Sequence, residues 1–271
     1  MRKIVIIFIL GLLVTSCEDV IDIDLNTAEP RLVIDASILW IKDTAGSSQI
    51  IHLTLTAPYF NDTIPVATGA TVTVTDSKNT VFNFIEDGSS GRYFNDTFTP
   101  LKNEEYTLNI LYKNETYLAT ETMTSVVPID YIEQKNDGGF SGEDIEIKAY
   151  YTDPENEKNF YLFDFFVVDR ETASLEVYDD EFTNGNEIFA FYSNEDLKTG
   201  DNLIIRNSGI SERTYEFFNI LLQQTDEDSG DPFQTQPATV RGNCVNQTNP
   251  DNYPLGYFKV SEVDVFTYVV Q

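Results

Sequence analysis

The stretch QIIHLTLT, residues 49–56, alternates apolar with polar side chains, and the stretch ATVTVTD, residues 70–76, repeats the same two-residue period. This alternation predicts β-strands with one packed face and one face in contact with water. Turn signals follow the strands, as in Asp87-Gly88-Ser89-Ser90-Gly91. Further β-rich stretches lie at 32–41, 81–85, 106–111 and 116–123. Because no helical pattern separates them, we predict an immunoglobulin-like antiparallel β-sandwich over residues 30–127.

Residues 128–271 predict a second β-rich domain. The run FYLFDFFVV, residues 160–168, is apolar on both faces and predicts a central strand that is covered on both sides. A loop is expected at 136–142. One helix is predicted at 211–224, where Ser211 can cap the start and Tyr215, Phe218 and Leu221 form an apolar stripe. Further strands are expected at 145–151, 175–178, 188–192, 203–206, 257–260 and 263–269.

The first residues predict export. Arg2 and Lys3 precede an apolar run over residues 4–14, which is shorter than the roughly 20 residues of a membrane-spanning helix. Small residues then lead to Cys17, the pattern of a bacterial lipoprotein signal. We predict a signal peptide over 1–16, lipid attachment at Cys17 and an acidic tether over 17–29. The alternative is an ordinary signal peptide with an unmodified cysteine.

Charge excludes some classes of partner. The chain has 45 acidic and 17 basic residues and a formal net charge of −28. Such a chain repels nucleic acid and offers no basic patch to neutralise phosphates, so we exclude DNA and RNA binding. It also suits anionic lipid headgroups poorly, so the lipid on Cys17 is expected to hold the protein at the membrane. With Cys17 acylated, Cys244 has no cysteine partner.

The sequence offers little for catalysis. His52 is the only histidine, and no Gly-x-Ser-x-Gly motif is present, so neither a catalytic triad nor a zinc site is expected. Cys244 as a catalytic thiol is an alternative that would need a nearby base. Paired carboxylates could serve glycoside hydrolysis. Asp164 stands out because it interrupts an apolar strand. A buried acid there needs a partner, and the alternative is a strand-end or strand-edge position facing water.

Two weaker binding hypotheses come from loops. Asp226, Asp228 and Asp231 place oxygen ligands around a turn glycine, which makes them candidates for calcium; the alternative is a solvated acidic turn after the helix. Most aromatic residues lie in phase with aliphatic residues and are expected in the core. Tyr151, Tyr253 and Tyr257 lie near loops and are the first aromatic candidates for ligand contact.

Several short motifs, taken in order, resemble the lipoprotein family called domain of unknown function 4249. They are Cys17-Glu18-Asp19-Val20-Ile21-Asp22, Glu29-Pro30-Arg31-Leu32-Val33-Ile34, Asp153-Pro154 with Asn159-Phe160-Tyr161, Asp231-Pro232-Phe233, Val240-Arg241-Gly242-Asn243 and Leu255-Gly256-Tyr257-Phe258. The resemblance implies an exported lipoprotein, often encoded beside TonB-dependent outer-membrane transporters, with no assigned catalytic residues. The acidic residues after Cys17 also resemble a surface-export signal of such lipoproteins.

These observations lead to one expected function and two alternatives. We expect a non-enzymatic outer-membrane lipoprotein at the cell surface, an accessory or ligand-capture component of a TonB-dependent uptake system. Its expected partners are the membrane, through Cys17, and the transporter. No cofactor is expected apart from the calcium candidate. The alternatives are a cell-surface adhesion or structural lipoprotein and, third, a hydrolase with paired carboxylates.

Overall fold

A computed structural model describes residues 29–58, 61, 63–139, 142–170, 172–225 and 240–271. The predicted signal peptide 1–16, Cys17 and almost all of the tether 17–29 lie outside these residues. The same holds for the calcium candidates Asp226, Asp228 and Asp231.

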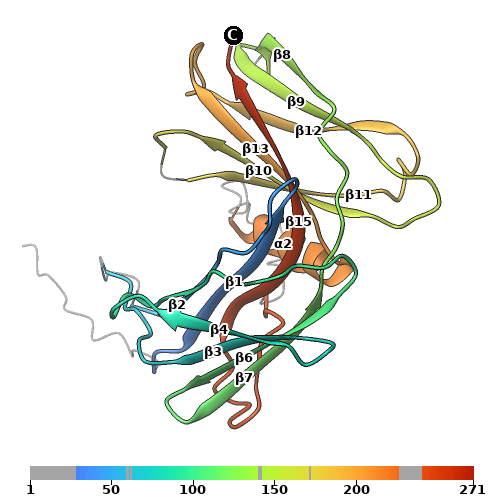
Figure 1. Ribbon diagram of the computed structural model, residues 1–271. Helices are drawn as coiled ribbons and strands as arrows, with labels where there is room; N and C mark the ends of the chain where they lie inside the picture. The colour runs from blue at the N-terminus through green and yellow to red at the C-terminus, as the bar shows by residue number, and fades with distance from the viewer. Residues whose placement is uncertain (1–28, 59–60, 62, 140–141, 171, 226–239) are drawn as a thin grey trace, which may run out of the picture.

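The N-terminal strands form the predicted sandwich (Figure 1). Strand β4 pairs with β5 and also with β3, so it joins the two layers β1-β2-β5 and β3-β6-β7 into one sheet folded on itself. The strands are β1 (Leu32–Ile41), β2 (Gln49–Leu55), β3 (Thr71–Asp76), β4 (Val81–Glu86), β5 (Arg92–Asn95), β6 (Glu105–Tyr112) and β7 (Glu115–Thr122).

The two-residue alternation of β2 determines which of its side chains enter the core of the first sandwich. Ile51 and Leu53 are fully buried, whereas Ile50 and His52 on the alternate face are half-buried. Ile34, Val74 and Phe84 come from three other strands and meet them in one apolar cluster. The hydrophobic effect therefore favours the register that the alternation predicts, since a slip of one residue would turn each apolar side chain outward.

The second half is also built from two layers of strands and carries the single helix of the described residues, which confirms the predicted mainly β fold with one helix. Sheet β12-β9-β8 packs on β11-β10-β13-β15 around Ile147, Phe163 and Ile205. The elements are β8 (Tyr131–Gly138), β9 (Asp144–Thr152), β10 (Phe160–Val167), β11 (Ser174–Asp179), β12 (Glu187–Asn194), β13 (Asn202–Gly209), α2 (Glu212–Thr225), β14 (Val245–Asn246) and β15 (Leu255–Val269). The loop expected at 136–142 is shorter, because β8 continues to Gly138.

Strand β15 belongs to both sandwiches. Its first part, 255–263, pairs in parallel with β1, and its last part, 263–269, pairs antiparallel with β13. In Figure 1 it runs from one body into the other. Phe258 lies in the first core and Phe266 packs on the second. The two strands expected at 257–260 and 263–269 are thus one, and the sandwich of residues 30–127 is completed by β14 and β15 from the C-terminal part.

The segment between β7 and β8 is fixed to β15 by its backbone. Val126 N–H donates to Glu262 Oε2 at 3.0 Å, and Ile129 N–H donates to Asp264 Oδ2 at 2.8 Å. Glu262 also forms ion pairs with Lys102 at 2.8 Å and Lys42 at 3.7 Å. Because these contacts occupy several backbone groups of the connection, it is part of the junction between the sandwiches rather than a free linker.

Helix α2 lies against the outer face of β10 and β11. Ser211 Oγ accepts a hydrogen bond from Thr214 N–H at 3.2 Å, so Ser211 caps the helix as predicted. Phe160 and Leu162 of β10 pack with Tyr215 and Phe218 of the helix. The other face of β10 packs in the second core, which confirms a central strand covered on both sides. Among the described residues, no helix has the length and hydropathy to span a bilayer.

Candidate functional site

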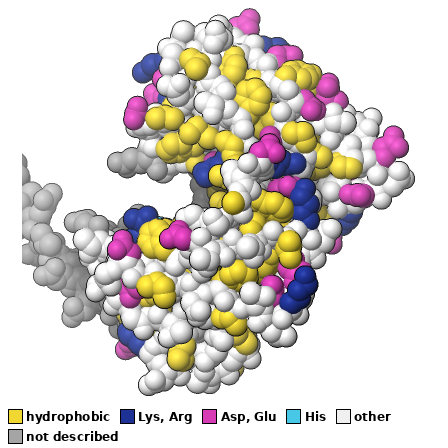
Figure 2. All heavy atoms as spheres, viewed as in Figure 1, with side chains coloured by type: hydrophobic (Ala, Val, Ile, Leu, Met, Phe, Trp, Pro, Cys, Tyr) yellow, Lys and Arg dark blue, Asp and Glu magenta, His cyan; other side chains and the backbone are white. Residues whose placement is uncertain are grey.

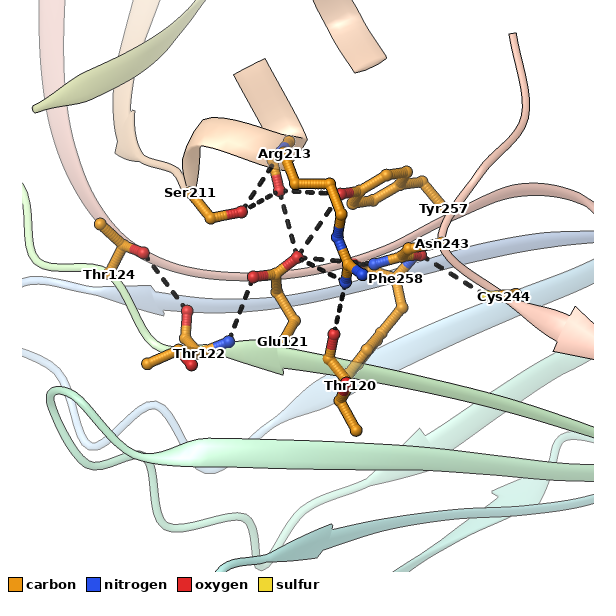
Figure 3. A network of polar contacts seen from close by, with 11 residues as sticks. Thr120, Glu121, Thr122, Thr124, Ser211, Arg213, Asn243, Cys244, Tyr257 and Phe258 are labelled. Atoms are coloured by element: carbon orange, nitrogen blue, oxygen red, sulfur yellow. Dashed lines mark hydrogen bonds and ion pairs between the residues drawn. The ribbon is translucent and has the colours of Figure 1, made fainter. Parts of the chain in front are cut away.

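The start of α2, the segment 240–244 and the first residues of β15 meet at one buried carboxylate, Glu121 of β7 (Figure 3). The side chain of Glu121 is 7% exposed and forms an ion pair with Arg213 at 3.5 Å. Its Oε2 also accepts hydrogen bonds from Thr214 Oγ1 at 3.3 Å, Tyr257 OH at 3.5 Å and Asn243 Nδ2 at 3.5 Å. Each bond is long, but together they give a buried charge the partners it needs.

Two glycines let segment 240–244 lie directly on β15. A Cβ at Gly242 would lie 1.6 Å from the carbonyl oxygen of Gly256, and a Cβ at Gly256 would lie 2.0 Å from that of Ile34. Gly256 also has φ +87°, which L side chains rarely adopt. The backbones of three segments therefore stack in a space that admits no side chain at either position.

A stack of cations and one aromatic ring lies beside these glycines. The guanidinium carbon of Arg31 is 4.0 Å from the ring centroid of Tyr253, and that of Arg241 is 4.2 Å from the same centroid. Arg31 also donates to the carbonyl oxygens of Asp251 and Tyr253. Within the described residues, Arg241 makes no hydrogen bond or ion pair, so its fork of donors is available to a ligand.

Arg213 and Arg241 line the same cavity of about 190 Å³ between α2 and segment 240–243. Apolar side chains of Phe217, Ile220 and Val240 form much of its wall. The rest of the lining comes from Glu216, Gly242, Asn243 and Tyr257. A neighbouring hollow of about 270 Å³ lies on the other side of Arg241 and is bounded by the Tyr253 loop. The two hollows together make a cationic and aromatic site in a chain of net charge −28.

Burial keeps two titratable groups at this site, Tyr257 and Cys244, in their protonated forms. Burial raises the pKa of Tyr257, so its hydroxyl stays protonated at neutral pH. Burial also raises the pKa of the Cys244 thiol to about 12, and this thiol is only 6% exposed. Since the thiolate is the nucleophile, Cys244 is a structural residue of the core and not the catalytic thiol considered above.

The other residues singled out in the sequence lie elsewhere. His52 is half-buried on β2, opposite Asp35 and Arg92, so neither cross-strand neighbour is a Ser, Thr or Cys. Asp164 lies on the central strand β10, so the strand-edge explanation is wrong; it is ion-paired with Arg206 at 2.9 Å instead. Within the described part of the chain, no three His, Cys, Asp or Glu side chains are grouped to hold a metal.

Of the three aromatic residues predicted for ligand contact, one lies in the core and two lie at this site. Tyr151 is 1% exposed and packs in the second core, so it is not available for ligand contact. Tyr253 and Tyr257 do reach the site. The charged residues of the site, Arg31, Arg213, Arg241 and Glu121, are not among the site residues predicted from the sequence. A signal for two of them was present, because Arg31 and Arg241 lie inside the motifs that carry the family resemblance.

Comparison with known proteins places this two-sandwich β protein in a family. The chain belongs to the family described as Domain of unknown function (DUF4249), whose model matches residues 18–267. A search of curated proteins finds no match. Among solved structures, the chain is similar to a two fibronectin type-III domain segment from chicken tenascin, with 12% identity over 67% of this chain and 91% of that chain. The TM-score is 0.22, too low to compare the arrangement of the two domains.

Proposed function

We propose that this protein is a non-enzymatic, lipid-anchored binding protein of the outer membrane, and that it serves a TonB-dependent uptake system as an accessory that captures a ligand. The observation that supports it best is the cationic and aromatic site around Arg241, which offers contacts for a ligand and no activated nucleophile. The fixed junction supports it as well, because a rigid scaffold presents its loops at constant positions.

Charge and the predicted leader support the location. On the face seen in Figure 2, acidic side chains are spread over both sandwiches. An acidic surface does not adhere to anionic headgroups, so the acyl chains on Cys17 would be the anchor. The link to a transporter comes from the gene neighbourhood that the family resemblance implies.

The anchor is tested with Cys17→Ser, which removes the acyl acceptor. The variant should leave the membrane fraction and lack acyl mass, whereas Cys244→Ser should remain in the membrane. Changing Glu18, Asp19 and Asp22 to alanine should keep the anchor but abolish cleavage by protease added to whole cells. Retention of the Cys17→Ser variant in the membrane fraction at the wild-type level would exclude lipid anchoring through Cys17.

The accessory role is tested by affinity purification from solubilised outer membranes and by deletion of the gene. We expect a large transporter to co-purify and uptake of one nutrient class to fall. Adhesion to matrix or to other cells, with normal uptake and no transporter, would instead support the adhesion lipoprotein. Turnover of a polysaccharide that is lost on changing one carboxylate would overturn the non-enzymatic assignment.

A further inference from the structure

We propose that the cavity between α2 and segment 240–243 binds an organic monoanion, a carboxylate attached to a small apolar body. The proposal names the ligand chemistry of the capture function and rests on that function for its biological purpose. The binding itself is a property of the described residues and can be measured without a transporter.

The positive charge of the cavity comes from two arginines, Arg213 on α2 and Arg241 on segment 240–244. Arg213 is held in place, because its Nη2 donates to the carbonyl oxygen of Thr120 at 2.7 Å and contacts Glu121. Arg241 is positioned differently, by the ring of Tyr253, and keeps its polar hydrogens unused within the described residues. A guanidinium with free donors matches the two oxygens of a carboxylate.

The wall of the cavity indicates that the part of the ligand beyond its carboxylate is small and apolar. Phe217, Ile220 and Val240 offer an apolar surface next to the two arginines. The volume of about 190 Å³ is of the size that accepts a single ring, since a cavity of about 150 Å³ in another protein holds benzene. Transfer of an apolar body from water to this apolar surface is favourable.

Glu216 limits the charge of the ligand. Its side chain lines the same cavity as the two arginines. A dianion such as a phosphate monoester would bring a second negative charge toward this carboxylate, at a cost that rises as water is excluded. A carboxylate has one charge and fits the single free guanidinium of Arg241. The arrangement therefore favours a carboxylate over a phosphate.

The test uses the full-length protein in detergent micelles, with 3-phenylpropionate as the probe and 3-phenylpropionamide as its uncharged match. Ligand-observed NMR should give a Kd on the order of 1 mM for the acid, as expected for so small a ligand. The amide should bind at least tenfold more weakly. Glu216→Gln should extend binding to phenyl phosphate, which the wild-type protein should bind poorly.

Arg241→Gln should weaken binding of the acid at least tenfold without lowering the melting temperature, because Arg241 is exposed and makes no hydrogen bond within the described residues. Arg92→Gln is the matched control: Arg92 is an exposed arginine over a phenylalanine ring, on β5 of the first sandwich. It should bind like the wild type. Equal binding of acid and amide, no binding of the acid, or an unchanged Arg241→Gln would each overturn the proposal.

These outcomes are separate from those of the uptake experiment. If the acid binds as described but deletion of the gene leaves uptake intact, the site is real and the accessory function fails. If deletion reduces uptake but the acid does not bind through Arg241, the accessory function stands and the carboxylate site is wrong.

Discussion

The side-chain amide of Asn243 pairs with the backbone of Phe258 as a neighbouring strand would. Phe258 N–H donates to Asn243 Oδ1 at 2.8 Å, and Asn243 Nδ2 donates to the carbonyl oxygen of Phe258 at 2.7 Å. At this point β15 has β1 on one side, and β13 joins its other side only from Val263 onward. Asn243 thus covers an open edge of β15, two residues along the chain from Arg241.

Gly256→Ala should be strongly destabilising, by about 3 kcal/mol or more, because the new Cβ has no space and the backbone has positive φ. Gly69→Ala is a matched control with φ +77° and no heavy atom within 4 Å of the added Cβ. This variant should lose only about 1 kcal/mol of unfolding free energy, because the positive φ is its sole source of strain. Urea unfolding of both variants checks this, and equal losses would show that crowding at Gly256 is relieved by a small shift.

Glu115 should control the loop that contains Asn246 and Asn252. Its carboxylate accepts hydrogen bonds from Tyr117 OH at 2.7 Å, Asn252 Nδ2 at 2.6 Å and Asn246 Nδ2 at 3.0 Å. These bonds, with that of Tyr117 the largest cause, lower the pKa of Glu115 below its ordinary value of 4.5. The stabilisation is therefore present above about pH 4.5 and is lost as the pH falls through the lowered pKa.

At pH 7, Glu115→Ala should speed hydrogen exchange of the backbone amides over residues 247–252, and the wild-type protein should show the same change only in acid. Glu105→Ala, an exposed glutamate on the neighbouring strand β6, should leave exchange unchanged. If the loop amides of Glu115→Ala remain protected at pH 7, the loop is held by packing and not by this carboxylate.

Cys244 should be almost inert in the folded protein. A rise of its pKa from 9.0 to about 12 lowers the thiolate fraction about a thousandfold at pH 8. In a Cys17→Ser background, iodoacetamide should label Cys244 rapidly only after denaturation, and a reducing agent should not change the melting temperature. Fast labelling of the native protein, measured by mass spectrometry, would contradict this.

Glu262→Ala should destabilise the junction by about 3 kcal/mol, because it leaves the N–H of Val126 unpaired and removes the buried partner of Lys102. Glu262→Gln keeps an acceptor for Val126 and should recover part of the loss. Differential scanning calorimetry would measure both. If Glu262→Ala melts like the wild type, the contact between β15 and the connection contributes little to stability.

Much of the fold could be read from local pattern. The alternation in QIIHLTLT and the two-sided apolar run FYLFDFFVV each specify a strand and the faces it buries, because burial acts on every residue of the period. The site could not be read in this way. Arg31 and Asp251 are 220 residues apart in sequence, and only the parallel pairing of β1 with β15 brings their segments together.

The strand that joins the two sandwiches also sets the order in which the protein can be assembled. Chains are synthesised from the N-terminus, and β15 follows every other strand of the described chain. Until it arrives, β1 lacks one neighbour and β13 another, and both present open edges on which chains aggregate. Neither sandwich can complete its sheet before this last strand has been synthesised.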